Sequence, residues 1–182
     1  MDHLTTIAQF DSVLKICRDL YIKKLHDYGA AWRILRPESM TDQIYIKASR
    51  IRSLETMGYS RVNEGIMPEF IGIVNYGIIG QIQLAAGYTD QPDMDADEAI
   101  AMYDRFASET RELLIAKNHD YDEAWRGMRI SSYTDLILMK LLRTRQIENN
   151  EGVTLVSEGI DANYKDMVNY AVFALIKLTE GK

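Results

Sequence analysis

The chain contains an internal duplication that spans most of its length. From His26 to Glu55, 15 of 30 positions are identical to the residues 93 positions further on. After one inserted residue the offset becomes 94, and Val74-Asn75-Tyr76 then matches Val168-Asn169-Tyr170. Solenoid repeats have periods of about 20–50 residues, so a period near 93 is too long for one. The pattern indicates two copies of a small domain fused head to tail.

Each copy is expected to form three helices. The chain has only 3 prolines and 11 glycines, which favours long helices over many short strands. Ser39 with Asp42, and Ser132 with Asp135, have the spacing of a capping box, so the second helices are predicted to begin near these serines. A polar loop before them is expected to hold the His-Asp-Tyr and Trp-Arg residues. The third helices, over 68–84 and 162–178, are apolar almost all round, which predicts that they are central.

A unit of about 80 residues leaves its most apolar helix poorly covered when it stands alone. Packing two copies about a pseudo-two-fold axis would cover both third helices where they meet. We therefore predict an all-α protein, with two tandem three-helix repeats packed as a pseudo-two-fold helical bundle. The repeats are expected at 1–86 and 98–182, joined by a linker at 87–97 into one compact unit.

Composition indicates which partners and which cellular compartment to expect. With 21 Lys+Arg against 27 Asp+Glu, the net charge of -6 makes a nucleic-acid partner unlikely. The single cysteine, Cys17, excludes an internal disulfide framework, and we expect a cytoplasmic protein. The most apolar stretch, 66–87, is interrupted by polar residues, so no membrane association is expected. Homo-oligomerisation is left open.

Paired basic residues are the first candidates for binding. Lys47 with Arg50, and Lys140 with Arg143, are three residues apart on predicted helices, so each pair shares a helix face. Each such pair can bind a phosphate group. The alternative is that these residues are ordinary solvated cations on the surface. The candidate set also includes charged and aromatic residues from both copies, namely Arg33, Arg126, Trp32, Trp125, Tyr28, Tyr121, His26, His119, Asp27 and Asp120. The rings could stack on a base or anchor the core, and His26 and His119 could equally cap helix ends.

Carboxylates that could bind a metal ion would distinguish an enzyme from a binding protein. Hydrolysis of a phosphoanhydride usually needs Mg²⁺ held by several carboxylates. The second copy is richer in such groups, and we predict a Mg²⁺ site from Asp120, Glu158 and Asp166. Glu64 is the counterpart of Glu158 in the first copy. Asp166 lies one turn inside an apolar helix, where a buried carboxylate needs a partner.

The order Lys-x-His-Asp-Tyr-Gly, Lys-x-x-Arg and Asp-x-x-Asn-Tyr-Ala resembles the nucleotide-modification-associated domain family. The matching residues are Lys24, His26, Asp27, Tyr28, Gly29, Lys47, Arg50, Asn75 and Tyr76, then Lys117, His119, Asp120, Tyr121, Lys140, Arg143, Asp166, Asn169, Tyr170 and Ala171. The resemblance implies nucleotide binding and adds Asn75 and Asn169 to the candidates. That family is similar, more distantly, to the MazG-type all-α nucleoside triphosphate pyrophosphohydrolases, which bind Mg²⁺ through Glu-x-x-Glu and Glu-x-x-Asp. The nearest patterns here are Glu109-x-x-Glu112 and Asn163-x-x-Asp166.

Two functions follow as hypotheses. The first is a helical protein that binds a small-molecule nucleotide, with Mg²⁺-dependent pyrophosphohydrolase-like activity as its enzymatic form; whether it is an enzyme is left open. The alternative is a non-catalytic protein-interaction module that uses the repeated Trp/Arg loops as interface anchors.

Overall fold

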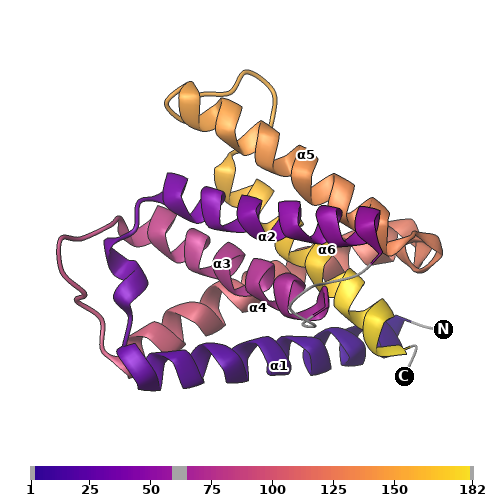
Figure 1. Cartoon of the computed structure of the whole chain (residues 1–182), viewed down its shortest axis with the longest axis horizontal. Coiled ribbons are helices and arrows are strands. Elements are labelled where there is room, and N and C mark those ends of the chain that lie inside the picture. Colours follow the sequence, from indigo (N-terminus) through magenta and orange to yellow (C-terminus); the bar gives the residue numbers. More distant parts are fainter. Residues whose placement is uncertain (1–2, 59–64, 181–182) are drawn as a thin grey trace.

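The computed structural model describes residues 3–58 and 65–180, which form six α-helices and two short 3₁₀ helices, with no strand in these ranges. The first repeat contains α1 (His3–Tyr28), η1 (Ala31–Ile34), α2 (Pro37–Met57) and α3 (Met67–Ala86). The second contains α4 (Ala96–Tyr121), η2 (Ala124–Gly127), α5 (Ile130–Asn149) and α6 (Ile160–Glu180). The predictions of an all-α class and of three long helices in each repeat are confirmed (Figure 1).

The two most apolar helices, α3 and α6, pack against each other at the centre, between α1 on one side and α2 and α5 on the other (Figure 1). They approach closely because α3 carries glycine at the crossing. A Cβ on Gly77 would lie 2.5 Å from Val168 Cγ2, and one on Gly80 would lie 2.9 Å from the Tyr164 ring. The prediction that the third helices meet is therefore confirmed.

Reciprocal ion pairs show the pseudo-two-fold relation between the repeats. Arg18 Nε lies 2.7 Å from Asp104 Oδ1, and Arg111 Nε lies 2.7 Å from Asp11 Oδ1. The two arginines are 93 residues apart, and so are the two aspartates, so each repeat offers the other the same pair of groups. This self-complementarity is the signature of a two-fold interface. The same reciprocity joins α2 to α5 through Arg52 with Asp135 and Arg145 with Asp42.

The second helix of each repeat begins earlier than predicted. α2 starts at Pro37 after Arg36, and α5 starts at Ile130 after Arg129, with no side-chain cap in either case. The backbone N–H groups of Ser39 and Ser132 donate to the carbonyls of Arg36 and Arg129, so both serines lie inside the first turn. The predicted capping boxes are wrong. In α2 the fixed φ of proline suits the start of the helix without a serine cap.

The His-Asp-Tyr residues do not lie in a loop as expected, because they form the last turn of α1 and of α4. In the first repeat the chain leaves the helix through Gly29, whose φ is +67° and whose N–H donates to the carbonyl of Leu25. In the second repeat Asp122 takes the left-handed conformation at the same place. The Trp-Arg residues follow in η1 and η2. The connection between the repeats runs over residues 87–95.

Two further features concern membrane association and the chemistry of the single cysteine. In the described part of the chain, no helix combines the length and apolarity that crossing a membrane requires. The Cys17 side chain is fully buried, and burial raises the pKa of its thiol to about 12. Cys17 is therefore a core residue and not a reactive thiolate.

Candidate functional site

A cleft of about 610 Å³ lies in the first repeat, where α1, η1, α2 and α3 meet. This volume falls in the range of roughly 300–1,000 Å³ that is usual for small-molecule sites. Its wall combines cations, one carboxylate and aromatic rings, namely Lys24, Lys47, Arg50, Glu69, Tyr21, Tyr28, Trp32 and Tyr76. Five of the predicted binding residues meet in this cleft: Tyr28, Trp32, Lys47, Arg50 and Asn75.

The charged residues in the described lining of the cleft differ in how closely they are paired. Glu69 is nearly fully buried, and its carboxylate accepts a hydrogen bond of 2.6 Å from Arg50. Lys47 Nζ stands farther away, at 3.5 Å from the same carboxylate. Lys24 lines the cleft and makes no ion pair with a described residue. Among the described lining residues three cations accompany one carboxylate, and charged donors of this kind suit an anion.

Aromatic rings form the other part of the wall. The Tyr28 side chain is 59% exposed at the end of α1, so its ring is available to a ligand. Partial burial raises the pKa of its hydroxyl, which therefore stays protonated at neutral pH. The Trp32 indole N–H is buried and has no hydrogen-bond acceptor among the described residues. Rings of this kind can stack on a planar base.

Asn75 and Asn169, which the family resemblance implied as ligands, hold helices together. Asn75 Nδ2 donates to the carbonyl of Cys17 at 3.0 Å, and its Oδ1 accepts from the Tyr103 hydroxyl at 2.7 Å. Asn169 Nδ2 donates to the carbonyl of Thr110 at 3.3 Å. Cys17 and Thr110 are 93 residues apart, so both asparagines tie the first helix of a repeat to its third. Their recurrence in both repeats has a packing explanation.

Arg33 also has a structural position. Its guanidinium is buried and bonds Gln83 Oε1, the carbonyl of Gly87 and, at 2.8 Å from Nε, Asp93 Oδ1. Gln83 in turn donates to backbone carbonyls of the η1 segment. These bonds fasten η1 to the end of α3, so Arg33 is not available to a ligand in this arrangement.

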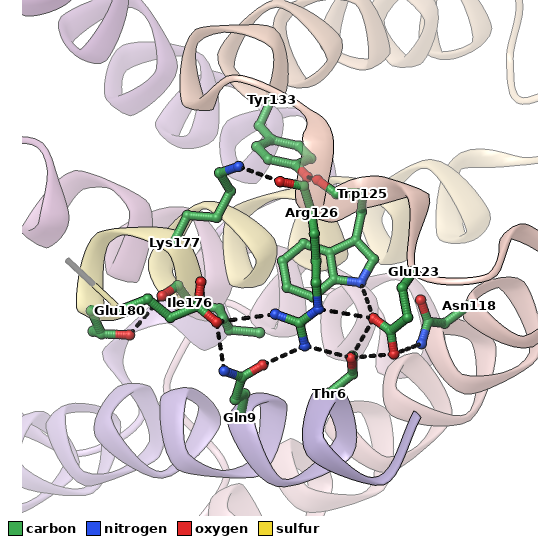
Figure 2. Close-up of polar contacts among 11 residues, drawn as sticks. Thr6, Gln9, Asn118, Glu123, Trp125, Arg126, Tyr133, Ile176, Lys177 and Glu180 are labelled. Carbon is green, nitrogen blue, oxygen red and sulfur yellow. Dashed lines mark hydrogen bonds and ion pairs between the residues drawn. The ribbon is translucent and has the colours of Figure 1, made fainter. Parts of the chain in front are cut away.

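Arg126 occupies the matching place in a different network, which Figure 2 shows. Its guanidinium donates to Glu123, Thr6, Gln9 and Glu180 and lies 4.4 Å from the centre of the Trp125 ring. Lys177 Nζ donates to the Arg126 carbonyl at 2.7 Å, where Gln83 serves the first repeat. Burial tends to raise the pKa of Glu123, but hydrogen bonds from Thr6 and Asn118 and the charge of Arg126 outweigh it and lower the pKa overall.

His26, Asp27, His119 and Asp120 project into solvent. Each histidine Nδ1 lies near the carboxylate of the next residue, at 3.7 Å in the first repeat and 3.5 Å in the second. His26 and Asp27 do not belong to the described lining of the cleft. A role for these four residues in ligand binding stays a prediction.

The second repeat differs most where its third helix faces the lysines. Asp166 is buried between Lys117 Nζ at 2.7 Å and Lys140 Nζ at 2.9 Å. Burial tends to lower the pKa of Lys117, and the hydrogen bond and charge of Asp166 more than offset it, so the pKa is raised overall. The partner that a buried Asp166 requires is thus a pair of lysines. With the offset of 94, the first-repeat counterpart of Asp166 is Gly72, which has no side chain.

The tryptophan of the second repeat is also more enclosed. The Trp125 ring stacks on Phe173 with centroids 4.3 Å apart, and its Nε1 donates to Glu123 Oε2 at 3.0 Å. The first repeat has Ile79 and Ala30 at the corresponding positions. Trp125 is 6% exposed, so in this repeat the ring belongs to the core.

Lys140 and Arg143 line another hollow, of about 830 Å³, between α5 and the loop that follows it. Glu158 lies in its wall, and its described lining contains no aromatic ring. Tyr121, 71% exposed, lies outside it at the end of α4. The cations and rings predicted to act together are therefore separated in the second repeat.

The structure does not gather the predicted metal ligands. Among the described residues, no group of three His, Cys, Asp or Glu side chains could hold a metal ion. Asp166 is neutralised by two lysines, Asp120 is exposed, and Glu158 lies in the loop before α6. Glu64 lies outside the described residues. The donor set does not fit Mg²⁺ as predicted, and a requirement for the ion stays a prediction.

Sequence reasoning missed several residues that shape the site. Glu69 was visible as an acid near the start of an apolar helix, but only the fold places it against Lys47 and Arg50. Lys24 and Lys117 stood in the matching pattern and were not selected as ligands. Gln83, Lys177 and Glu123 carried no repeat signal, because their counterparts in the other repeat are different residue types.

The fold shows a duplicated all-α protein whose first repeat contains a cleft lined by cations and aromatic rings. The chain belongs to the family described as Nucleotide modification associated domain 1, whose sequence profile matches residues 24–84 and 117–178, one segment in each repeat. Comparisons with curated proteins and with solved structures found no match. The resemblance to the nucleotide-modification-associated family is confirmed, and the more distant similarity to MazG-type enzymes stays a prediction.

Proposed function

We propose that the protein binds a nucleotide in the cleft of its first repeat. The observation that carries the proposal is the meeting of Lys24, Lys47 and Arg50 with Tyr28 and Trp32 in one cleft of ligand size. Lysine and arginine supply charged donors for phosphate oxygens, and the rings supply flat apolar surfaces for a base. Membership of a nucleotide-modification-associated family supports the same ligand class.

Hydrolysis is a finer proposal that rests on binding. A MazG-like reaction would need Mg²⁺, and the predicted carboxylates do not come together in the described residues. The proposal is therefore stated for binding, and turnover is tested separately by the release assay below. Arg33 and Trp125, two of the anchors that the protein-interaction alternative would use, are buried and bonded within the chain.

A thermal-shift panel of nucleosides and their mono-, di- and triphosphates, each with and without Mg²⁺, tests the proposal. A ligand at a hundred times its Kd adds about 2.7 kcal/mol to the free energy of unfolding, so binding should raise Tm clearly. Phosphate or pyrophosphate release in the same mixtures reports hydrolysis. If no nucleotide shifts Tm at millimolar concentration, the proposal is wrong.

A matched pair of variants localises the site. Lys24→Ala removes a cation that lines the cleft and has no ion pair with a described residue, so it should weaken binding about ten-fold while Tm without ligand stays the same. Lys23→Ala removes the neighbouring cation, which is not in the described lining, and should leave binding unchanged. Equal effects of the two variants would mean that the cleft is not the site.

A further inference from the structure

The second repeat shows how this fold holds an anion between two lysines. The Asp166 carboxylate spans Lys117 and Lys140, with one oxygen 2.7 Å from the first ammonium and the other 2.9 Å from the second. These distances are those of charge-assisted hydrogen bonds. The lysines come from α4 and α5, and the carboxylate comes from α6, so three helices converge on one negative group.

The first repeat has the same two cations without that carboxylate. Lys24 and Lys47 are the counterparts of Lys117 and Lys140, and Gly72 is the counterpart of Asp166. All three line the 610 Å³ cleft. A Cβ on Gly72 would lie 3.2 Å from Lys47 Cε, so the lysine stem passes directly over the glycine.

Glu69 does not take the place of the missing carboxylate. It lies almost one helical turn before Gly72, and its direct hydrogen bond comes from Arg50 at 2.6 Å. Lys47 is held less closely, at 3.5 Å, and Lys24 has no ion pair with a described residue. In the second repeat Asn163 stands at the position of Glu69, and the acid of the third helix lies three residues further on, at Asp166.

We propose that the space above Gly72 is a phosphate subsite, in which Lys24 and Lys47 bind a phosphate group as Lys117 and Lys140 bind the Asp166 carboxylate. The inference rests on the proposed nucleotide cleft and specifies which part of it receives the phosphate. It also assigns a role to Asp166, which fills the equivalent subsite of the second repeat from within the chain. Each chain therefore binds one phosphate-bearing ligand at this position.

Isothermal titration calorimetry with inorganic pyrophosphate tests the subsite on the full chain. Wild-type protein should bind one pyrophosphate per chain at this subsite. Gly72→Asp should weaken binding about ten-fold or more, because an internal carboxylate competes for both lysines. Lys23→Ala is the matched control, since Lys23 is not in the described lining of the cleft, and it should change binding no more than about two-fold. Equal binding by wild type and Gly72→Asp, or no binding by wild type, would overturn the subsite.

Two further variants exchange residues at equivalent positions of the two repeats. Glu69→Asn combined with Gly72→Asp copies the second repeat into the first and should abolish pyrophosphate binding without loss of folding. Asp166→Gly copies the first into the second and should raise the stoichiometry from one to two. Asp166→Gly removes the partner of Lys140, so circular dichroism checks that this variant folds. If it unfolds, the double variant of Glu69 and Gly72 still tests the proposal. A double variant that binds like wild type contradicts the proposal.

The nucleotide panel separates this inference from the proposed function. If nucleotides bind wild type and Gly72→Asp equally well, the cleft is a nucleotide site and the subsite is wrong. If pyrophosphate binds and is lost in Gly72→Asp, while no nucleotide or nucleoside binds, the subsite stands and the proposed function is wrong.

Discussion

The two repeats have the same helices and much of the same sequence, yet they use equivalent positions differently. In the first, Gly72 leaves Lys24 and Lys47 facing a cleft, and the Trp32 N–H has no acceptor among the described residues. In the second, Asp166 bonds both lysines, and Trp125 is held by Glu123 and Phe173. In a duplicated domain, one copy can thus leave a lysine pair facing a cleft while the other bonds the equivalent pair internally.

The largest effect is expected from removing the internal anion. Asp166→Ala leaves Lys140, whose side chain is 12% exposed, without its partner, while Lys117, at 46%, can rehydrate. Breaking a buried ion pair costs about 3 kcal/mol or more. Glu69→Ala is the comparison in the first repeat. It should lower the free energy of unfolding by less, about 1 kcal/mol, because about a third of the Lys47 and Arg50 side chains is exposed and can rehydrate. Urea unfolding measures both. A larger loss for Glu69→Ala would mean that the first repeat is the more tightly closed one.

A smaller effect is expected where the repeats cross. Gly77→Ala places a methyl group 2.5 Å from Val168 Cγ2, so α3 and α6 must separate, at a cost of about 2 kcal/mol. Its counterpart with the offset of 94 is Ala171. Ala171→Gly relieves no such contact and should cost about 1 kcal/mol, the helix penalty of glycine. Thermal unfolding compares the two, and a stabilised Gly77→Ala protein would refute the close crossing.

The smallest effect concerns pH and two carboxylates of the second repeat. Burial raises the pKa of Glu148, and Glu38 and Asp42 add to it. Because the folded pKa lies above the unfolded one, Glu148 lowers stability as pH rises from about 4.5 through the folded pKa. Glu148→Gln should therefore be more stable than wild type at pH 7, and this advantage should vanish in acid.

Glu123→Gln is the control of opposite sign. The pKa of Glu123 is lowered in the folded state, so its contribution is present above about pH 4.5 and is lost as pH falls through the folded pKa. The variant should be less stable than wild type at neutral pH, and the difference should narrow in acid. Urea midpoints between about pH 3 and pH 7 give both curves, and parallel curves for the two variants would contradict the opposite shifts.

Much of the architecture was predictable from the repeat and the hydrophobic pattern. The third helices were expected at the centre because they are apolar almost all round, and α3 and α6 do meet there. The starts of α2 and α5 were not predicted correctly, because a serine and an aspartate three residues apart occur inside a first turn as well as at a cap.

The candidate site was predicted in part. Lys47, Arg50, Tyr28 and Trp32 do line one cleft. Arg33, Arg126, Asn75 and Asn169 bond within the chain, and their expected role in nucleotide binding stays a prediction. A residue that recurs in both repeats recurs for packing as readily as for binding, so recurrence alone cannot separate the two roles.

The sequence alone was enough to establish the duplication, the helical class and the repeated cationic and aromatic residues, since these follow from the spacing of apolar residues and from identities at a fixed offset. Which lysine pair is bonded to a buried carboxylate and which faces a cleft was decided by contacts between residues distant in the chain. Lys117 and Asp166 are 49 positions apart, and Arg50 and Glu69 are 19 apart. Whether a charge is buried with a partner or left facing solvent depends on how three helices pack, and packing sets the electrostatic environment of each group.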